Sequence, residues 1–369
     1  MKKKRICMIT NIGPHYRYPI FSLMGEQLGC HFFLGDRIRE ALHIFPYDRL
    51  KGFRLTLRNR YGGKFFWQQG VGHALRPSYD CYILDGEPYN VSSWVVLLVA
   101  KVLHKQTIGW THGWYGRETR IKRWVKRCYF ALHSHLLVYS ERAIKLMQAE
   151  GIAPHKMSCI ANSLDSDRLK AIRATLNPTT VYSSHFHNTL PTLIYCGRVQ
   201  QSKRIDLLLE AVRNLREEGM PLNVVIVGPE IDKEDLVNGV AEAGLTDYVW
   251  LYGPCYDDNT LASLYYNAHA CVSPGGVGLT VIHALSFGCP VITHDNLAEQ
   301  GPEAEAITEN LTGSLFEQGN VDDLKVCIRK WVTVDEEKRR HTREAAYREI
   351  DSKWNVHYQL RMLNKAIYG

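Results

Sequence analysis

The chain has no apolar run long enough to cross a bilayer, which takes roughly 20 residues in a helix. The nearest approach, Trp94 to Leu103, is about half that length and contains Lys101. The amino terminus, MKKKRICMIT, is basic and then apolar like a signal peptide, but its apolar part is short and no small-residue cleavage site follows it. We therefore predict no spanning helix, and a first strand at residues 5–10.

The ten cysteines form no C-x-x-C pair, so the sequence lacks the paired spacing of a zinc site. Several of them stand inside apolar runs, namely Cys7, Cys81, Cys196 and Cys271. This placement favours reduced, buried thiols and a cytoplasmic protein over a disulfide framework.

The sequence also lacks short repeats and low-complexity tracts. Its composition, 45% hydrophobic and 22% charged, is that of a globular protein. Because 369 residues exceed what one ordinary core holds, we expect two domains.

The charge is unevenly divided along the chain. Residues 1–176 carry 28 Lys and Arg against 12 Asp and Glu, a net +16, and the remainder carries 17 against 26, a net −9. Such a basic half indicates an anionic partner, which membrane lipid, nucleic acid or a phosphorylated substrate could each supply. The densest run, Arg117 to Arg127, places Ile121 and Trp124 at helical spacing among its cations. We predict that this run lies on an anionic membrane surface, a solvated helix face being the alternative.

Short apolar runs alternate with longer segments through the first half, which favours a parallel sheet covered on both faces. The expected strands are residues 5–10, 30–34, 80–84, 106–110, 135–139 and 158–161. Ligands of such sheets bind at the carboxyl ends of the strands. The candidate residues there are Gly13, His15, Arg17, Asp85, Glu87, His112 and Gly113, although ordinary loop and turn chemistry would also explain them.

A second alternating series follows a polar segment. Residues 166–190 contain a proline and show no period, so we interpret them as a linker. Beyond it, strands are expected at 192–196, 223–227, 248–251, 270–273, 290–293 and 313–316. Apolar residues at helical spacing predict a helix from Ile205 to Leu215. The second half is therefore predicted to form another doubly wound domain.

The stretch from Ala270 to Asn296 reads as a buried strand, a glycine loop, a short helix and a second buried strand. The helix is expected to open at Leu279 and to end at Gly288, which suits a left-handed residue. A loop without side chains that leads into a helix offers unpaired N–H groups to an anion, most often a phosphate. Tight packing alone could also select the loop residues Pro274, Gly275, Gly276 and Gly278.

Two cations accompany this loop. The strand at 192–196 is followed by Gly197 and Arg198, and Lys203 stands five residues later. Both cations are predicted at the carboxyl edge of the sheet that carries the glycine loop, where they could neutralise a diphosphate.

With these motifs in this order, nearly the whole chain resembles the retaining glycosyltransferases of family four, which have two Rossmann-like domains in the arrangement called GT-B. The segments that carry the resemblance are GRVQQSKRIDLLLEAVRNL (197–215), VVIVGPE (224–230), SPGGVGLTVIHALSFGCPVIT (273–293), EAITENLTGSLF (305–316), HGWYGRE (112–118) and CIANSLDSDRL (159–169). The loop PHYRYPIF (14–21) and the phrase GLTVIHALSFGCPVITHDN also resemble a subgroup that builds bacterial surface polysaccharides.

The resemblance implies an α/β fold with two Rossmann-like, doubly wound domains facing a central cleft. Residues 1–175, completed by 350–369, would form the acceptor-side domain, and residues 188–349 the domain that binds the nucleotide sugar. The last helix would thus cross back to the first domain.

The resemblance also implies roles for particular residues. Arg198 and Lys203 would bind the donor diphosphate, and His112 would line the cleft near the sugar; these three are the predicted catalytic residues. Gly13 would approach the diphosphate. The remaining donor-binding positions are the N–H groups of Gly276, Val277, Gly278 and Leu279, together with His283 and Glu305.

One departure from the family pattern stands out. Most relatives place two glutamates eight positions apart, where this sequence has Gly275 and His283. The first change removes a carboxylate that would contact the donor sugar. The second replaces a ribose-binding carboxylate by an imidazole, which still offers one acceptor and one donor.

The function implied is transfer of a sugar, with retention, from a nucleotide-diphosphate donor to a lipid-linked or membrane-associated glycan in O-antigen or capsule biosynthesis. The protein would be cytoplasmic and peripheral on the inner face of the plasma membrane, with no metal, no further cofactor and no nucleic-acid partner. A catalytically silent GT-B subunit, suggested by the missing glutamates, and a nucleotide-sugar epimerase on the same fold are the alternatives.

Overall fold

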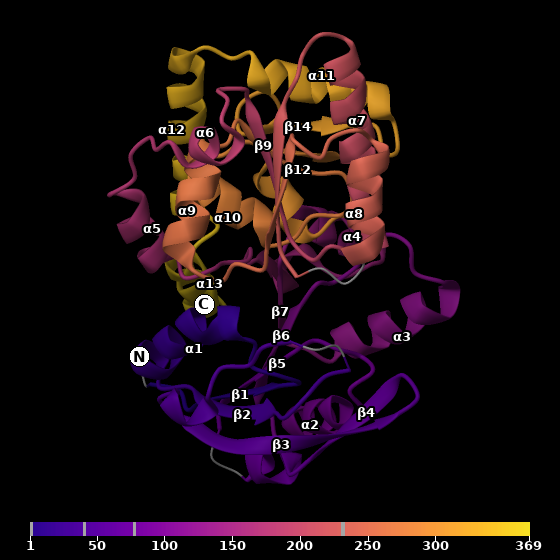
Figure 1. Cartoon of the computed structure of the whole chain (residues 1–369). Helices are drawn as coiled ribbons and strands as arrows, with labels where there is room; N and C mark the ends of the chain where they lie inside the picture. Colours follow the sequence, from indigo (N-terminus) through magenta and orange to yellow (C-terminus); the bar gives the residue numbers. More distant parts are fainter. Residues whose placement is uncertain (1–2, 40–41, 77–78, 230–232) are drawn as a thin grey trace. The chain divides into compact units, whose positions relative to one another are not determined.

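The computed structural model describes residues 3–39, 42–76, 79–229 and 233–369. The chain forms two compact units, Met1–Asp165 with Asn355–Gly369, and Ser166–Trp354 (Figure 1). Each unit is built on one largely parallel sheet, so the predicted α/β class with two Rossmann-like domains is confirmed. Among the described residues, no helix is both long and apolar enough to cross a membrane.

The first unit holds an eight-stranded sheet in the order β4-β3-β2-β1-β5-β6-β7-β8. Its strands are β1 (Ile6–Thr10), β2 (His31–Gly35), β3 (Phe53–Gly62), β4 (Phe65–Gln69), β5 (Cys81–Leu84), β6 (Gln106–Thr111), β7 (His135–Val138) and β8 (Met157–Cys159). All neighbours are parallel except the hairpin β3–β4. The strand order reverses between β1 and β5, which is where such sheets bind ligands.

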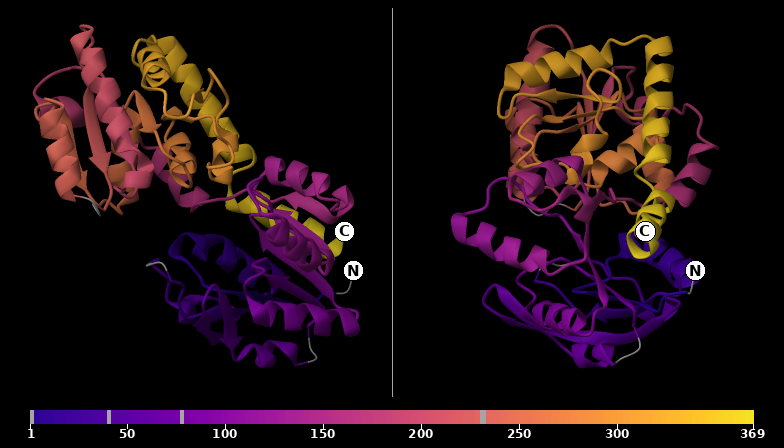
Figure 2. Two further views of the ribbon diagram at one scale, coloured as in Figure 1. Left: turned by 90° about the vertical axis from the view of Figure 1, so that its right-hand side faces the viewer. Right: turned by 180° about the vertical axis from the view of Figure 1, so that it is seen from behind.

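Helices cover both faces of this sheet. The helical segments are η1 (His15–Arg17), α1 (Tyr18–Leu23), η2 (Met24–Leu28), η3 (Tyr47–Arg49), η4 (Val71–Leu75), α2 (Val91–Val102), α3 (Arg120–Ala131), α4 (Glu141–Ala149), η5 (Pro154–Lys156) and α13 (Val356–Tyr368). One core contains residues of α1, η2 and α13, and the other contains residues of α2, α3 and α4. The yellow helix α13 packs beside the indigo α1 in Figure 2, so the end of the chain completes the first unit.

The second unit has a six-stranded, fully parallel sheet in the order β11-β10-β9-β12-β13-β14, which is the Rossmann order 3-2-1-4-5-6. The strands are β9 (Thr192–Cys196), β10 (Asn223–Val227), β11 (Val249–Gly253), β12 (Ala270–Ser273), β13 (Val291–His294) and β14 (Gly313–Phe316). Its helical segments are α5 (Ser166–Arg173), α6 (Val181–Phe186), η6 (Gln201–Lys203), α7 (Ile205–Glu217), α8 (Lys233–Glu242), α9 (Asp258–Asn267), α10 (Thr280–Ser286), η7 (Pro302–Ala306), α11 (Val321–Val332) and α12 (Glu336–Ser352). The order reverses between β9 and β12.

Residues 166–190, interpreted as a linker from the sequence, are partly helical in the structure and pack within the second unit. Residues 166–190 contain the helices α5 and α6, and both pack against α9 of the second unit. The Tyr182 hydroxyl donates to the Leu264 carbonyl at 2.6 Å, and Arg168 pairs with Asp258 at 3.0 Å. These contacts join residues far apart in the sequence, which explains why composition alone suggested a linker.

Candidate functional site

The glycine loop lies where the second sheet reverses its strand order. It follows β12, which pairs directly with β9, so the ends of these two strands are neighbours. The Thr280 hydroxyl, at the start of α10, donates to the Cys196 carbonyl at the end of β9, 3.0 Å away. Gly288 takes the left-handed conformation predicted for it, with φ at 73°. The strand, loop, helix and strand predicted for this stretch are therefore all present.

Arg198 and Lys203 come from the segment that follows β9. The Lys203 ammonium donates to the Gly276 carbonyl of the loop, and the Gly275 N–H donates to the Lys203 carbonyl at 3.0 Å. Burial, and then the nearby Arg198 cation, lower the pKa of Lys203. Within the described part of the chain, neither cation is paired with a carboxylate. An anion bound here would relieve their mutual repulsion.

Gln300 fixes the loop in place, and the sequence reasoning missed it. Its buried amide donates to the His294 carbonyl at 2.8 Å and to the Thr293 hydroxyl at 2.9 Å. Its oxygen accepts from the Val277 N–H at 2.7 Å, and the Gly301 N–H donates to the Val277 carbonyl at 2.9 Å. The Val277 N–H is therefore not free to meet an anion, which differs from the cradle expected from the sequence.

Gly275 has a packing reason to lack a side chain. A β-carbon there would stand 2.4 Å from the Ser202 carbonyl oxygen and 2.7 Å from the Lys203 Cα. A β-carbon on Gly276 would stand 2.6 Å from the Glu299 carbonyl oxygen, whereas one on Gly278 would meet nothing within 4 Å. Of the loop glycines, Gly278 alone leaves open space around its backbone.

The N–H groups that remain for an anion are those of Gly276, Gly278 and Leu279, none of which makes a hydrogen bond within the described residues. Helix α10 has only seven residues, so its dipole contributes little. An anion site in this unit depends on these amides and on the two cations.

His283 projects from α10 into an aromatic setting. Its ring centroid lies 5.5 Å from that of Tyr265 and 5.4 Å from that of Phe287. Burial lowers the pKa of His283 to about 4, so the ring is neutral at pH 7. Among the described residues its Nε2 has no hydrogen-bond partner, and it lies 3.6 Å from an oxygen of Asp258. The ring therefore combines packing with one unused nitrogen.

The other predicted acidic position, Glu305, lies half-buried in η7, which packs against α10. Glu230, the last residue of the segment VVIVGPE, lies outside the described residues.

Gly13, in the first unit, follows β1 and is covered by aromatic rings. Its N–H donates to the Tyr47 hydroxyl at 2.9 Å, and that hydroxyl donates to the Gly35 carbonyl at 2.8 Å. A β-carbon on Gly13 would stand 2.8 Å from the Tyr47 ring and 3.0 Å from the Phe45 ring. The glycine is therefore needed for close packing, whatever else its loop contacts.

His112 follows β6 and belongs to an aromatic and cationic group. Its ring centroid lies 4.5 Å from that of Tyr139, and Arg17 stacks over Tyr139 and donates to its hydroxyl. Surrounding protein atoms, and then the cations Arg17 and Lys126, lower the pKa of His112 to about 4, although the residue keeps an exposed face. A neutral, partly exposed imidazole offers one donor and one acceptor to a ligand.

An ion pair shapes the loop after His112. The Lys126 ammonium lies 2.7 Å from a Glu118 oxygen and donates to the Gly113 carbonyl at 2.8 Å. Glu118 accepts from the N–H groups of Tyr115 and Gly116, at 2.9 and 3.0 Å. Both charged groups are largely buried, so the loop is held from both of its ends.

Asp85 stands after β5, where the first sheet reverses its order. One of its oxygens accepts from the Asn11 N–H at 2.9 Å, and the other is buried and has no hydrogen-bond partner within the part of the chain that the structure describes. Burial, and then the neighbouring Glu87 carboxylate, raise the pKa of Asp85 to about 7. Asp85 and Glu87 thus differ from simple turn residues, since both carboxyl groups are shielded from solvent.

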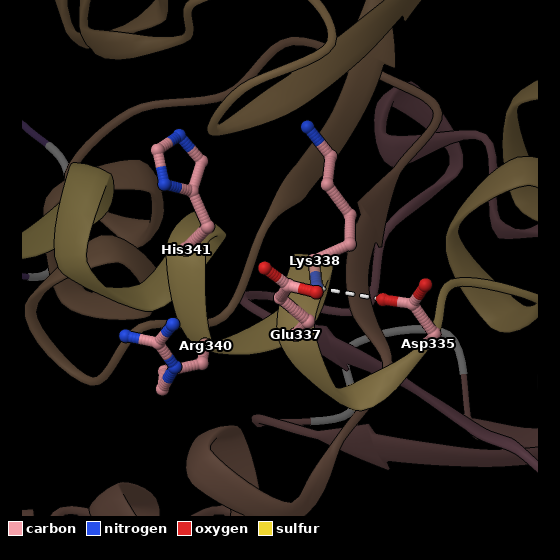
Figure 3. A pocket seen from close by; sticks show the side chains of 5 residues that line it. All are labelled: Asp335, Glu337, Lys338, Arg340 and His341. Carbon is pink, nitrogen blue, oxygen red and sulfur yellow. Dashed lines mark hydrogen bonds between the residues drawn. The ribbon is translucent and has the colours of Figure 1, made fainter.

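A separate hollow of about 280 Å³ lies at the start of α12 (Figure 3). It is lined by Asp335, Glu337, Lys338, Arg340 and His341. Asp335 caps the helix by accepting from the Lys338 N–H at 2.7 Å. Since no strand end contributes to this hollow, we do not regard it as the candidate site.

The second unit of the chain resembles a known protein family. Residues 182–349 match the family model described as glycosyl transferases group 1. A D-inositol 3-phosphate glycosyltransferase from Streptomyces bingchenggensis (strain BCW-1) is 32% identical over 142 residues, which are 35% of this chain and 30% of that protein. The matched segment thus spans less than a third of the length of this relative.

Two solved structures resemble the chain over its full length. The lipopolysaccharide outer core galactosyltransferase WaaB matches with a TM-score of 0.73 and 15% identity, covering 99% of both chains. HepE from Anabaena, in complex with UDP, matches with a TM-score of 0.72 and 12% identity, covering 98% of this chain and 99% of that one. At these identities the likeness establishes the fold.

Proposed function

We propose that this chain, whose residues 182–349 match the family model of the group 1 glycosyl transferases, moves a sugar with retention from a nucleotide-diphosphate donor to a glycan acceptor. The observation that carries the proposal is the pair Arg198 and Lys203. These cations lack carboxylate partners among the described residues and stand beside a glycine loop with open N–H groups at the carboxyl edge of a Rossmann sheet.

The chemistry follows from this charge arrangement. As the bond between sugar and diphosphate breaks, negative charge develops on the leaving phosphate. Arg198, Lys203 and the loop amides stabilise that charge more strongly than the charge of the intact donor. The leaving phosphate then accepts the proton of the attacking hydroxyl. No metal is needed for charge neutralisation in this scheme.

Each remaining site residue has a proposed role. His283 offers its unused Nε2 to the ribose, and Glu305 contributes an acidic position to the donor site. On the first unit, the neutral ring of His112 contacts the sugar, and the loop around Gly13 approaches the diphosphate. Uridine is the first base to test, since the similar fold of HepE has been solved with UDP and with UDP-glucose.

The proposed acceptor is a lipid-linked or membrane-associated glycan in surface-polysaccharide synthesis. The name of WaaB, which refers to the lipopolysaccharide outer core, supports this context. On α3, the side chains of Ile121 and Trp124 are 77% and 67% exposed among exposed cations, as peripheral attachment to an anionic leaflet requires. The protein would then work on the inner face of the plasma membrane.

One experiment tests the core of the proposal. The protein is incubated with a panel of nucleotide sugars, UDP-glucose included, and release of nucleotide diphosphate is measured. Arg198→Ala and Lys203→Ala should each lower turnover by at least two powers of ten, because each charge-assisted contact strengthens as the diphosphate leaves. Arg213→Ala, an exposed cation on α7, is the matched control and should retain turnover.

The outcomes separate the alternatives. Donor binding without diphosphate release in any acceptor mixture would indicate a silent subunit. Conversion of one nucleotide sugar into another, with the diphosphate intact, would indicate an epimerase. Full turnover in Arg198→Ala or Lys203→Ala would remove the diphosphate site from this position.

A further inference from the structure

The hairpin β3–β4 extends beyond the sheet to which it belongs. Strand β2 pairs with β3 only as far as Gly35, which lies opposite Leu57. The next five residues of β3 pair with β4 alone, from Arg58 opposite Gln69 to Gly62 opposite Phe65. Because β2 and β3 are parallel, this part projects past the carboxyl end of β2, the edge where ligands of such sheets bind.

The inner face of the hairpin is anchored at that edge. Asn59 and Gln68 are buried, and their amides donate to the carbonyls of Asn11 and Thr10, at 2.7 and 3.0 Å. Asn59 Oδ1 also accepts from Gln68 at 3.2 Å. The projecting segment is therefore held against the end of β1 by side-chain hydrogen bonds.

The outer face combines aromatic rings with cations. Residues directly opposite in an antiparallel pair share a face, so Arg60 stands beside Trp67 and Arg58 beside Gln69. Trp67 is 40% exposed and Phe65 is 47% exposed, which is high for such large apolar side chains. Arg60 donates to the Gln69 side chain at 3.3 Å, which holds its guanidinium along the strand.

The charge of this region is of one sign. From Arg49 to Tyr79 the sequence contains seven Lys and Arg and no Asp or Glu. Among the described residues, Arg58 and Arg60 make no ion pair with a carboxylate. The outer face thus presents two guanidinium groups that no carboxylate of the described residues pairs with.

We propose that this outer face binds an anionic oligosaccharide, the acceptor chain of the transfer. Aromatic rings pack against the apolar faces of sugar rings, and guanidinium groups pair with carboxylate or phosphate in fixed geometry. Five residues of strand extend about 16 Å, enough to contact several sugar units. The acceptor role rests on the proposed function, whereas the binding itself does not.

A membrane is the less suitable partner for this face. The tip of the hairpin is Gly62, Gly63 and Lys64, which carries no apolar side chain to enter a bilayer. Lys64 lies over the rings of Phe65 and Tyr89, at 5.5 and 5.3 Å, so charge covers the aromatic group nearest the tip. The exposed Trp67 lies along the strand, opposite Arg60, rather than at the tip.

The test measures binding of acidic oligosaccharides directly. The probes are short oligomers of a uronic acid, of sialic acid and of a phosphorylated sugar, with a neutral glucan oligomer for comparison. At least one acidic probe should bind wild-type protein tenfold or more tightly than the neutral one, and more weakly as salt rises. Trp67→Ala and the double variant Arg58→Gln/Arg60→Gln should each lose at least tenfold in affinity for that probe.

A matched control lies on α3 of the same unit. The double variant Trp124→Ala/Arg120→Gln removes an exposed Trp and an exposed Arg elsewhere and should bind the acidic probe like wild type. Trp67→Phe retains a ring and should keep most of the affinity. Melting temperature and nucleotide binding, measured on the same samples, show that each variant is folded.

Three results would overturn the proposal: no binding of any acidic probe, equal losses in the α3 control, or loss of vesicle binding in Trp67→Ala with oligosaccharide binding unchanged. The transferase proposal fails separately. Suppose that the protein turns over no nucleotide sugar while Trp67→Ala still weakens the binding of an acidic oligomer. In that case the outer face remains a binding site for acidic oligosaccharides, and only its role as acceptor site is refuted.

Discussion

The Ser202 carbonyl oxygen lies 2.4 Å from the point where a β-carbon on Gly275 would stand. Backbone atoms of η6 thus occupy the space that a side chain at this position, such as the glutamate of the family pattern described above, would need. A glycine at position 275 therefore allows the segment that carries Lys203 to pack closely against the loop. The same packing includes a hydrogen bond, which the Gly275 N–H donates to the Lys203 carbonyl.

Gly275→Ala should destabilise the second unit, because the new methyl group overlaps backbone atoms that cannot rotate away. We expect a loss of roughly 1 to 3 kcal/mol in the free energy of unfolding. Gly275→Glu should be at least as unstable and should gain no turnover. Gly278→Ala, which would meet nothing within 4 Å, is the matched control. Equal melting temperatures of the Gly275→Ala and wild-type proteins would show that the backbone of η6 can move to make room for the methyl group.

Gln300→Ala should loosen the glycine loop. It leaves the Val277 N–H and the His294 carbonyl without their partner, at a cost of roughly 1 to 3 kcal/mol. Donor binding should weaken together with stability, as measured by calorimetry and thermal melting. Gln318→Ala removes an exposed amide nearby and should change neither quantity. Normal donor affinity in Gln300→Ala would show that the Gln300 hydrogen bonds to the glycine loop are not needed for donor binding.

His283→Phe separates packing from polar contact. The ring contacts with Tyr265 and Phe287 can persist in this variant, so its melting temperature should stay near that of wild type. If Nε2 contacts the ribose, donor affinity should fall about tenfold, equivalent to about 1.4 kcal/mol. His283→Ala should lose stability as well. Wild-type donor affinity in His283→Phe would place the histidine in the core alone.

His133 should make the protein less stable in acid. Burial lowers the pKa of His133 to about 4, whereas an exposed histidine titrates near 6.5. Below pH 6.5, His133 therefore binds a proton in the unfolded chain but stays neutral in the folded chain. The free energy of unfolding falls as a result when the pH drops from 6.5 to 4. In His133→Gln, chemical denaturation should show this fall reduced by roughly 1 to 3 kcal/mol. Parallel pH curves for the two proteins would contradict this account.

Trp124→Ala should weaken attachment to anionic membranes. The protein should sediment with vesicles that contain anionic lipid and should be released as salt rises, since charges are screened beyond roughly 10 Å at 0.1 M salt. Removing the exposed ring of α3 should lower the bound fraction several-fold. Trp67→Ala is the control, with a Trp of another exposed face. Vesicle binding that depends on neither the lipid charge nor the salt concentration would refute the electrostatic contribution to membrane attachment.

The sequence by itself determined those features that adjacent residues decide. Every strand predicted from a short apolar run is present, because short apolar runs bounded by turn residues are typical of strands buried on both faces of a parallel sheet. The turn at Gly288 and the placement of Arg198 after β9 follow in the same way from neighbouring residues. The order of these motifs also indicated the resemblance to glycosyltransferases, and residues 182–349 match a family model of that description.

The tertiary structure alone decided the features that join distant residues. Gln300 reaches Val277 across 23 positions, and Asn59 reaches Asn11 across 48. The hairpin β3–β4 interleaves charged and apolar residues, which a search for short apolar runs overlooks. The contact between Gly275 and η6 depends on two loops that meet only after β9 and β12 have paired. A glycine that the sequence shows as a missing carboxylate is thus also a packing requirement, because steric exclusion acts between atoms in space, whatever their separation along the chain.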